Sequence, residues 1–200
     1  IKWTSGLPTF DYKNQGRITP KAMAFTDMTK STGLDFKHDE NDFVEFNRER
    51  LIPFMVSKEG PAMAVGDVNG DGLEDIFFGN AKRKASALYL QNNNGQFTKQ
   101  ETPVFEETAL WEDVDAVFAD LENDGDLDLI IASGGNEFQK QNEPMKQRTY
   151  LNDGNGDFTR KDVFEDAFLT ASSVTATDFN ADGLVDFFFA ARALPWNYGK

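Results

Sequence analysis

Three nine-residue acidic segments contain the residues of this chain that could bind a metal ion. Each segment has oxygen-bearing side chains at its first, third, fifth and ninth places and a glycine at its sixth. These side chains are Asp67, Asn69, Asp71 and Asp75 in the first segment, Asp120, Glu122, Asp124 and Asp128 in the second, and Asp178, Asn180, Asp182 and Asp186 in the third. Oxygen ligands around a sharp turn are what Ca²⁺ prefers. The sequence therefore predicts up to three calcium sites.

The residues around these loops distinguish them from EF-hands. An EF-hand needs a bidentate Glu at its twelfth place and a helix on either side. The twelfth places here are Phe78, Ile131 and Phe189, which cannot bind an ion. The loops are preceded by residues 62–66, 115–119 and 173–177 and lead into residues 75–79, 128–132 and 186–190. These short β-branched, small and aromatic runs predict strands, so each loop should join two strands.

A second repeated pattern follows the first two loops. Residues 88–98 match residues 149–159, with Tyr and Phe in register around an Asn/Gly-rich turn, which predicts a hairpin. Successive loops begin 53 and 58 residues apart, at Asp67, Asp120 and Asp178. Four short strands recurring at about 40 to 50 residues or slightly more are typical of a propeller blade. The predicted fold class is therefore all-β, with four-stranded antiparallel units as β-propeller blades.

The sequence resembles the FG-GAP or VCBS repeat proteins, whose blades also build the integrin α-subunit propeller. FGNA at residues 78–81 is similar to the motif that names the family, and GDVNGDG at residues 66–72 is similar to its calcium loop. A narrower resemblance is to secreted VCBS-repeat proteins of Bacteroidetes, related to the ASPIC/UnbV and cartilage acidic protein group. The residues that carry it are 25–29, 36–53, 59–61 and 191–196.

The resemblance implies a ligand set and a blade number. The side chains named above would bind calcium, joined by the seventh-place carbonyls of Leu73, Asp126 and Leu184. Loop two departs from the family pattern, because Glu122 replaces the usual Asn or Asp and Asn123 replaces the usual Gly. The family also implies seven blades, which would need at least about 350 residues. At 200 residues we therefore expect a partial propeller cut from a longer protein.

The repeats divide the chain into five parts. We expect residues 1–18 to be the tail of a preceding module or a linker, and residues 19–60 to be an entry segment with edge strands. Blade units should follow at residues 61–112 and 113–170, and residues 171–200 should begin a third, truncated unit.

Composition narrows the range of partners and compartments. The net charge of −14 disfavours nucleic acid as a partner, because binding it requires Lys and Arg against phosphates. No apolar run approaches the roughly 18 to 20 residues of a membrane span. The chain has no Cys, which excludes disulfides and thiol catalysis. Calcium loops of this kind are suited to calcium-rich surroundings, so we expect an extracellular, cell-surface or periplasmic location.

Few residues outside the loops predict chemistry. His38 is the single histidine, and no catalytic triad or zinc site can be assembled around it. Residues 134–148 contain an insertion of eight residues relative to the first unit, which predicts either a solvated loop or a ligand-binding loop. The equivalent loop of the first unit contains Lys82-Arg83-Lys84, which we interpret as either a solvated turn or an anion-binding site. Trp111, Trp196 and Tyr198 could pack between blades or stack on sugars.

These observations lead to three hypotheses of function. The first is a non-catalytic, calcium-binding adhesion module for a protein or glycan partner. The second is a carbohydrate-active enzyme, a lyase or hydrolase, with paired carboxylates on the same scaffold. The third is a structural spacer in a larger surface protein.

Overall fold

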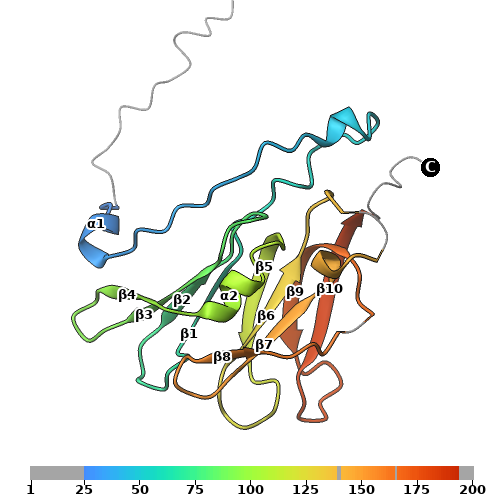
Figure 1. Cartoon of the computed structure of the whole chain (residues 1–200). Coiled ribbons are helices and arrows are strands. Elements are labelled where there is room, and N and C mark those ends of the chain that lie inside the picture. Colours follow the sequence, from blue (N-terminus) through green and yellow to red (C-terminus); the bar gives the residue numbers. More distant parts are fainter. Residues whose placement is uncertain (1–24, 139–140, 165, 194–200) are drawn as a thin grey trace, which may run out of the picture.

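The computed structural model describes residues 25–138, 141–164 and 166–193 (Figure 1). The expectations for residues 1–18, Trp196 and Tyr198 lie outside these ranges. Within them, no helix is long and apolar enough to cross a membrane.

Three antiparallel sheets follow one another along the chain. Sheet 1 has the order β1 (Met63–Gly66), β2 (Asp75–Phe78), β3 (Ala87–Gln91) and β4 (Phe97–Gln100). Sheet 2 has the order β5 (Asp113–Ala119), β6 (Asp128–Ser133), β7 (Arg148–Asn152) and β8 (Phe158–Arg160). Sheet 3 pairs β9 (Thr170–Thr177) with β10 (Asp186–Ala193). These four-stranded antiparallel units confirm the predicted all-β fold class and are consistent with propeller blades.

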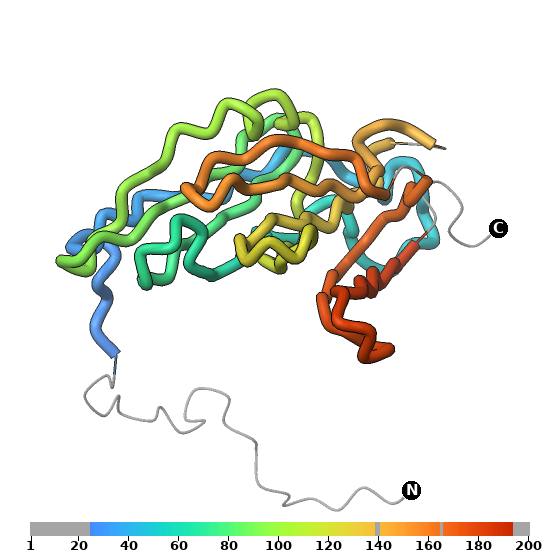
Figure 2. Tube along the Cα trace, turned by 90° about the horizontal axis from the view of Figure 1, so that it is seen from below, coloured from blue at the N-terminus to red at the C-terminus, as the bar shows by residue number. Residues whose placement is uncertain are grey.

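Each acidic segment connects the first two strands of its sheet, as the sequence predicted. Gly66 pairs with Asp75, Ala119 with Asp128 and Thr177 with Asp186. The ninth residue of each loop is therefore already part of the strand ladder. We call residues 67–75, 120–128 and 178–186 loops 1, 2 and 3. All three lie at the lower edge of the sheets in Figure 1, and Figure 2 shows that edge from below.

The sheets pack face to face through their first strands, with β1 against β5 and β5 against β9. All six residues of β6 are buried, because sheet 2 is covered on both sides. Side chains alternate along a strand. Leu129 and Ile131 accordingly contribute to the core shared with sheet 1, and Ile130 and Ala132 to the core shared with sheet 3.

A short helix that the sequence did not predict completes the first core. Helix α2 (Pro103–Glu107) connects β4 to β5 and begins with Pro at its first turn, where a missing N–H costs nothing. Its Phe105 is 2% exposed and packs edge-on against Phe77 and Tyr150, each at 5.4 Å between ring centroids. Thr108, just after the helix, lies 2.8 Å from the Tyr150 hydroxyl.

The chain before sheet 1 crosses the edge opposite the loops (Figure 1). It contains α1 (Thr29–Thr32) and the 3-10 helix η1 (Glu45–Asn47), but residues 25–60 form no β-strand. In the described part of the entry segment, residues 25–60, the expected edge strands do not form, because this part is held by side-chain contacts and not by a ladder. Phe36 stacks on Phe78 with ring centroids 4.8 Å apart, and Asp35 accepts a hydrogen bond from the Tyr89 hydroxyl at 2.5 Å.

Candidate metal centres

Loops 1 and 3 fold into the same hydrogen-bonded turn. In loop 1 the Asp67 carboxylate accepts hydrogen bonds from the backbone N–H groups of Asp71 at 3.1 Å and Gly72 at 2.8 Å. In loop 3 the Asp178 carboxylate does the same with Asp182 at 3.1 Å and Gly183 at 2.9 Å. Asp and Asn side chains readily bond to backbone N–H groups two to five residues ahead. The spacing of polar residues in the sequence is therefore what shapes the turn.

The third and fifth places are tied into the same turn. Asn69 Oδ1 accepts a hydrogen bond from the Asp71 N–H at 3.1 Å, and Asp71 Oδ1 accepts one from the Leu73 N–H at 2.9 Å. Loop 3 repeats both bonds, each at 2.9 Å, with Asn180, Asp182 and Leu184. One N–H is thus shared by oxygens of the first and third places, which brings these two predicted ligands together.

The fourth and sixth places have left-handed backbone conformations. The sixth is glycine in every loop, with φ of 83°, 99° and 87° at Gly72, Gly125 and Gly183. The fourth is Gly70 with φ 70°, but Asn123 with φ 58° and Ala181 with φ 60°. Asn tolerates this region better than other L-residues, so Asn123 in place of the family's Gly keeps the turn intact. Ala181 is strained.

The ninth-place aspartates link strands as well as closing the loops. Asp75 is buried, and its carboxylate accepts hydrogen bonds from the N–H groups of Val68 at 3.1 Å and Gln91 at 2.8 Å. Asp128 repeats this with Leu121 at 2.8 Å and Asn152 at 2.9 Å. Each carboxylate thus joins its loop to the third strand of the sheet.

The charge state of these two aspartates reflects their surroundings. Burial raises the pKa of Asp75 and of Asp128, and the charges of other loop carboxylates raise both further. The neighbours that contribute are Asp71 and Asp67 in loop 1 and Asp124 and Glu122 in loop 2. Each loop therefore concentrates negative charge that a cation would neutralise.

Loop 2 differs at its third and seventh places. Glu122 pairs with Lys161 at 3.1 Å, so its carboxylate reaches toward the chain after β8. The side chain of Asp126 lies beside the hairpin turn of sheet 2, where a Cβ added to Gly154 would be 2.6 Å from Asp126 Oδ2. The first place of loop 2 forms the same hydrogen bonds as in loops 1 and 3. Asp120 accepts hydrogen bonds from the N–H groups of Asp124 at 3.1 Å and Gly125 at 2.9 Å.

The donor chemistry of the loops fits Ca²⁺, which takes carboxylate, amide and carbonyl oxygens. Their side chains are not gathered around a common point, however. Among residues 25–138, 141–164 and 166–193, no three His, Cys, Asp or Glu side chains converge closely enough to hold a metal ion. The carboxylates are bonded to backbone N–H groups of their own turns instead. Calcium at Asp67, Asp120, Asp178 and their partners stays a prediction.

The opposite edge brings together two segments that the sequence analysis treated separately. Lys82, in the connection from β2 to β3, forms an ion pair with Glu137, in the connection from β6 to β7. Its Nζ lies 4.2 Å from the ring centroid of Phe138. Asn136, Gln147 and Arg148 are 1%, 2% and 1% exposed. Both ends of residues 134–148 therefore pack into the protein, whereas residues 141–143 are exposed to solvent.

A buried carboxyl at this edge was missed from the sequence. Glu112, just before β5, is 2% exposed, and neither of its side-chain oxygens has a hydrogen-bond partner among the described residues. Burial raises the pKa of Glu112 to about 9, and the charges of Glu40, Glu137 and Asp113 add to the shift. The backbone N–H of Lys82 lowers the pKa of Glu112, but it forms no hydrogen bond of normal geometry with the carboxyl group.

The single histidine and one tryptophan lie near this edge, and each contacts charged side chains. His38 Nε2 is 2.6 Å from Glu40 Oε1, which fits a local hydrogen-bonding role. Trp111 is 7% exposed and lies beneath two guanidinium groups, with Arg160 at 5.0 Å and Arg148 at 5.5 Å from the ring. Trp111 is therefore a packing residue in this structure, not an exposed platform for a sugar.

Comparison with known proteins agrees with the repeated loops. The FG-GAP-like repeat family matches residues 67–131, which run from the first residue of loop 1 into β6 and include all of loop 2. No curated protein matches the chain, so no named relative supports the narrower resemblance to the Bacteroidetes group. Residues 67–131 are an FG-GAP-like repeat within a chain of propeller-like antiparallel sheets.

Proposed function

We propose that this protein is a calcium-stabilised, propeller-type binding module that acts outside the cell and has no catalytic activity. The observation that carries the proposal is the shared turn of loops 1 and 3, in which oxygens of the first and third places meet at one N–H. The repeated polar spacing shapes this turn in both loops. A common requirement to hold an ion explains why the spacing is repeated.

The residues that would hold the ions are the side chains at places one, three, five and nine, with the seventh-place carbonyls of Leu73, Asp126 and Leu184. Bound Ca²⁺ would supply positive charge that neutralises the clustered carboxylates. Loop 2 must release Glu122 from Lys161 to use it, so loop 2 is expected to bind most weakly.

A partner would most reasonably meet the edge opposite the loops. Loops positioned by a rigid scaffold are where proteins usually place binding residues. Here the largely buried Lys82–Glu137 ion pair, with Phe138 beside it, holds two connections together. A rigid edge of this kind suits a protein or a glycan.

One observation favours the enzyme hypothesis. Glu112 beside Glu40 and Glu137 is a set of carboxyl groups outside the loops, one of them with its pKa raised to about 9. Glycoside hydrolysis uses a protonated and an ionised carboxyl. However, Glu112 is 2% exposed, so a sugar cannot reach it in this structure, and the binding module comes first.

Titration calorimetry with Ca²⁺ on chelator-treated protein tests the proposal, with thermal unfolding in parallel. We expect up to three bound ions and a higher melting temperature, since a free concentration of 100 Kd stabilises by about 2.7 kcal/mol. Asp71→Ala should lose one site, whereas Asp157→Ala, an exposed acid outside the loops, should lose none. Absence of binding, or equal melting with and without chelator, would falsify the proposal.

The function beyond calcium needs a separate test. A glycan array with and without chelator distinguishes a glycan-binding module from a spacer, and product release from polysaccharides would support an enzyme. Binding that disappears with chelator and returns with Ca²⁺ is the expected result.

A further inference from the structure

Buried oxygens without partners are found at the edge opposite the loops. Neither carboxylate oxygen of Glu112 has a hydrogen-bond partner among the described residues, and the same holds for Oε2 of Glu40 and Oδ1 of Asn136. Glu112 and Asn136 are 2% and 1% exposed, so bulk solvent does not replace the missing partners. Buried polar groups in folded proteins nearly always have a partner, which can be a bound water or an ion.

Three segments that are distant in the sequence meet around the Glu112 carboxyl, which precedes β5. The connection from β6 to β7 lies against it, since Gly134 donates a hydrogen bond to the Glu112 carbonyl at 3.0 Å. A Cβ added to Gly135 would be 3.4 Å from Glu112 Oε2, and Asn136 is the next residue. From the segment before sheet 1, Glu40 lies near enough for its charge to act on Glu112. The unpartnered oxygens therefore come from separate parts of the fold and not from one loop.

The nearby lysine is already paired. Lys82 forms an ion pair with Glu137, and both carboxylate oxygens of Glu137 accept hydrogen bonds, so this residue contributes charge but no free oxygen. Oε1 of Glu40 is 2.6 Å from His38 Nε2, which leaves its Oε2 as the oxygen without a partner. Among the described residues, Glu40 and Glu112 form no ion pair with a Lys or Arg. Buried charges are normally paired or bound to a metal ion, and two carboxylates balance one divalent cation.

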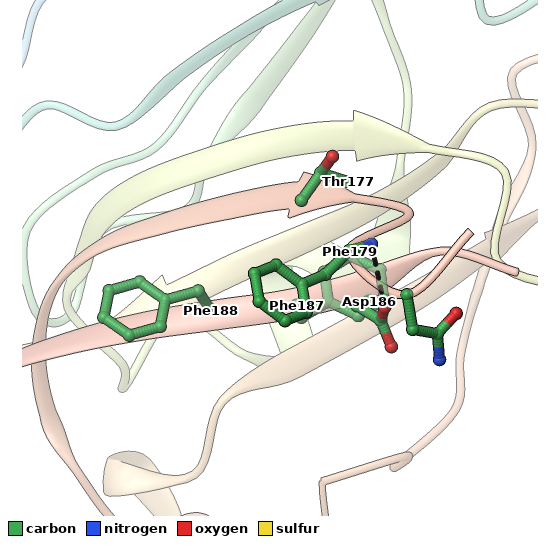
Figure 3. Close-up of a pocket in the computed structure, with 6 residues that line it drawn as sticks. Thr177, Phe179, Asp186, Phe187 and Phe188 are labelled. Atoms are coloured by element: carbon green, nitrogen blue, oxygen red, sulfur yellow. Dashed lines mark hydrogen bonds between the residues drawn. The ribbon is translucent and has the colours of Figure 1, made fainter. Parts of the chain in front are cut away.

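A hollow on sheet 3 differs from this edge in its lining. It has a volume of about 380 Å³ and is lined by Thr177, Phe179, Asn180, Asp186, Phe187 and Phe188. Figure 3 shows Asp186 beside Phe179, whose backbone N–H donates a hydrogen bond to the carboxylate at 3.0 Å. None of the lining residues has a buried side-chain oxygen without a partner. The hollow on sheet 3 therefore has no interior charge that requires an ion.

We propose that the edge opposite the loops holds a divalent cation through oxygen ligands, with carboxylates from Glu112 and Glu40 and the amide oxygen of Asn136. Ca²⁺ takes carboxylate and amide oxygens, and water completes its coordination. This set is not a group of three His, Cys, Asp or Glu side chains, which the described residues lack, because one of its three donors is an amide. In the cation-free protein Glu112 holds a proton, which the cation displaces on binding. The ion would tie the segment before sheet 1 to sheet 2, at a place separate from the loops.

Residue-resolved NMR separates this site from the loops. When chelator-treated protein is titrated with Ca²⁺, the amide signal of Gly135, beside Glu112, should shift until it saturates, in addition to that of Gly72 in loop 1. Glu112→Gln keeps the shape of the side chain without its charge. In this variant the Gly135 shift should disappear, whereas the Gly72 shift should persist with the same midpoint.

Two further variants test the ligand set. Glu40→Gln removes the second charge and should weaken the Ca²⁺ affinity measured at Gly135 by about 10- to 100-fold, as when a group that supports a metal ion is lost. Glu107→Gln removes an acid of the same type at an exposed position of α2 and is the matched control. It should leave both shifts as they are in the unaltered protein. Circular dichroism checks that each variant is folded.

The same titration can overturn the proposal without deciding the fate of the loops. A Gly72 amide that shifts while Gly135 does not would leave the loops as calcium sites and remove the site at the edge. A Gly135 shift of equal size and midpoint in Glu112→Gln would show that the ion does not bind this carboxylate, which also contradicts the proposal. A Gly135 shift without one at Gly72 would support the edge site and contradict calcium in loop 1.

Discussion

The Arg148 guanidinium and the Asp113 carboxylate form an ion pair inside the protein, with side chains 1% and 3% exposed. Asp113 also accepts hydrogen bonds from the Asn80 N–H and the Ser86 hydroxyl, and Arg148 donates to the Ser133 and Tyr150 hydroxyls. The pair therefore connects the beginning of β5 with β7 and with the chain that follows β2.

Removing one member of this pair should be costly. Asp113→Asn leaves a buried guanidinium without its counter-charge, which should lower the free energy of unfolding by about 3 to 5 kcal/mol. Urea unfolding followed by fluorescence measures this. Asp162→Asn, which removes a 39% exposed partner of Arg160, should change the free energy of unfolding by less than about 1 kcal/mol. Equal effects would show that the interior pair is not desolvated.

The ninth-place aspartates should differ in their contribution to stability. Asp128→Ala removes the acceptor of two backbone N–H groups, at a cost of about 1 to 3 kcal/mol for each that stays buried. Among the described residues, Asp186 accepts one hydrogen bond, from the N–H of the exposed Phe179, so Asp186→Ala should cost less. Unfolding in chelator separates this role from ion binding. A larger loss for Asp186→Ala would contradict the structural ranking.

The backbone strain at Ala181 can be relieved. Its φ of 60° costs an L-residue about 1 to 2 kcal/mol, which glycine avoids at the expense of greater freedom in the unfolded chain. Ala181→Gly should therefore raise the free energy of unfolding by about 0.5 to 1 kcal/mol. The reverse change in loop 1, Gly70→Ala, should lower it by a similar amount. Ala176→Gly, in the extended strand β9, is the control and should destabilise.

Glu112 should make stability depend on pH. Its pKa of about 9 in the folded protein lies far above the ordinary glutamate value of 4.5, because of burial and of the nearby charges of Glu40, Glu137 and Asp113. Between these values the folded state holds a proton that the unfolded chain releases, so stability falls as pH rises, by up to about 1.4 kcal/mol per unit.

The pH test compares unfolding across that window. Glu112→Gln keeps the shape without the ionisable group, so its advantage over the unaltered protein should grow steadily from pH 5 to pH 9. Glu106→Gln, at an exposed position of α2, should leave the slope unchanged. Parallel curves for the Glu112 variant and the unaltered protein would show that this carboxyl ionises freely.

Local patterns predicted the sheets well and the opposite edge poorly. The loop spacing located β1, β2, β5, β6, β9 and β10, since alternation and turn chemistry are properties of neighbours in sequence. Helix α2 has five residues and depends on the packing of Phe105 between sheets, which has no signal in so short a segment.

The contacts at the opposite edge are long-range. Lys82 meets Glu137 across 55 positions, and Asn136 donates a hydrogen bond to Glu49 across 87. No periodicity relates such residues. Glu112, three residues before the predicted strand of residues 115–119, could have been noticed as an acid near the border of a buried run, but its neighbours Glu40 and Glu137 could not.

Asn152 connects two loops that belong to different sheets. Its side-chain amide donates hydrogen bonds to the Val68 carbonyl of loop 1 at 2.7 Å and to the Leu127 carbonyl of loop 2 at 3.1 Å, and its oxygen accepts one from the Gly156 N–H at 3.0 Å. Ordering either loop therefore removes part of the conformational entropy that the other still has to lose. Loops 1 and 2 should behave as a thermodynamically coupled pair, in which a ligand bound at one loop raises the affinity of the other, while loop 3, outside this bridge, responds alone.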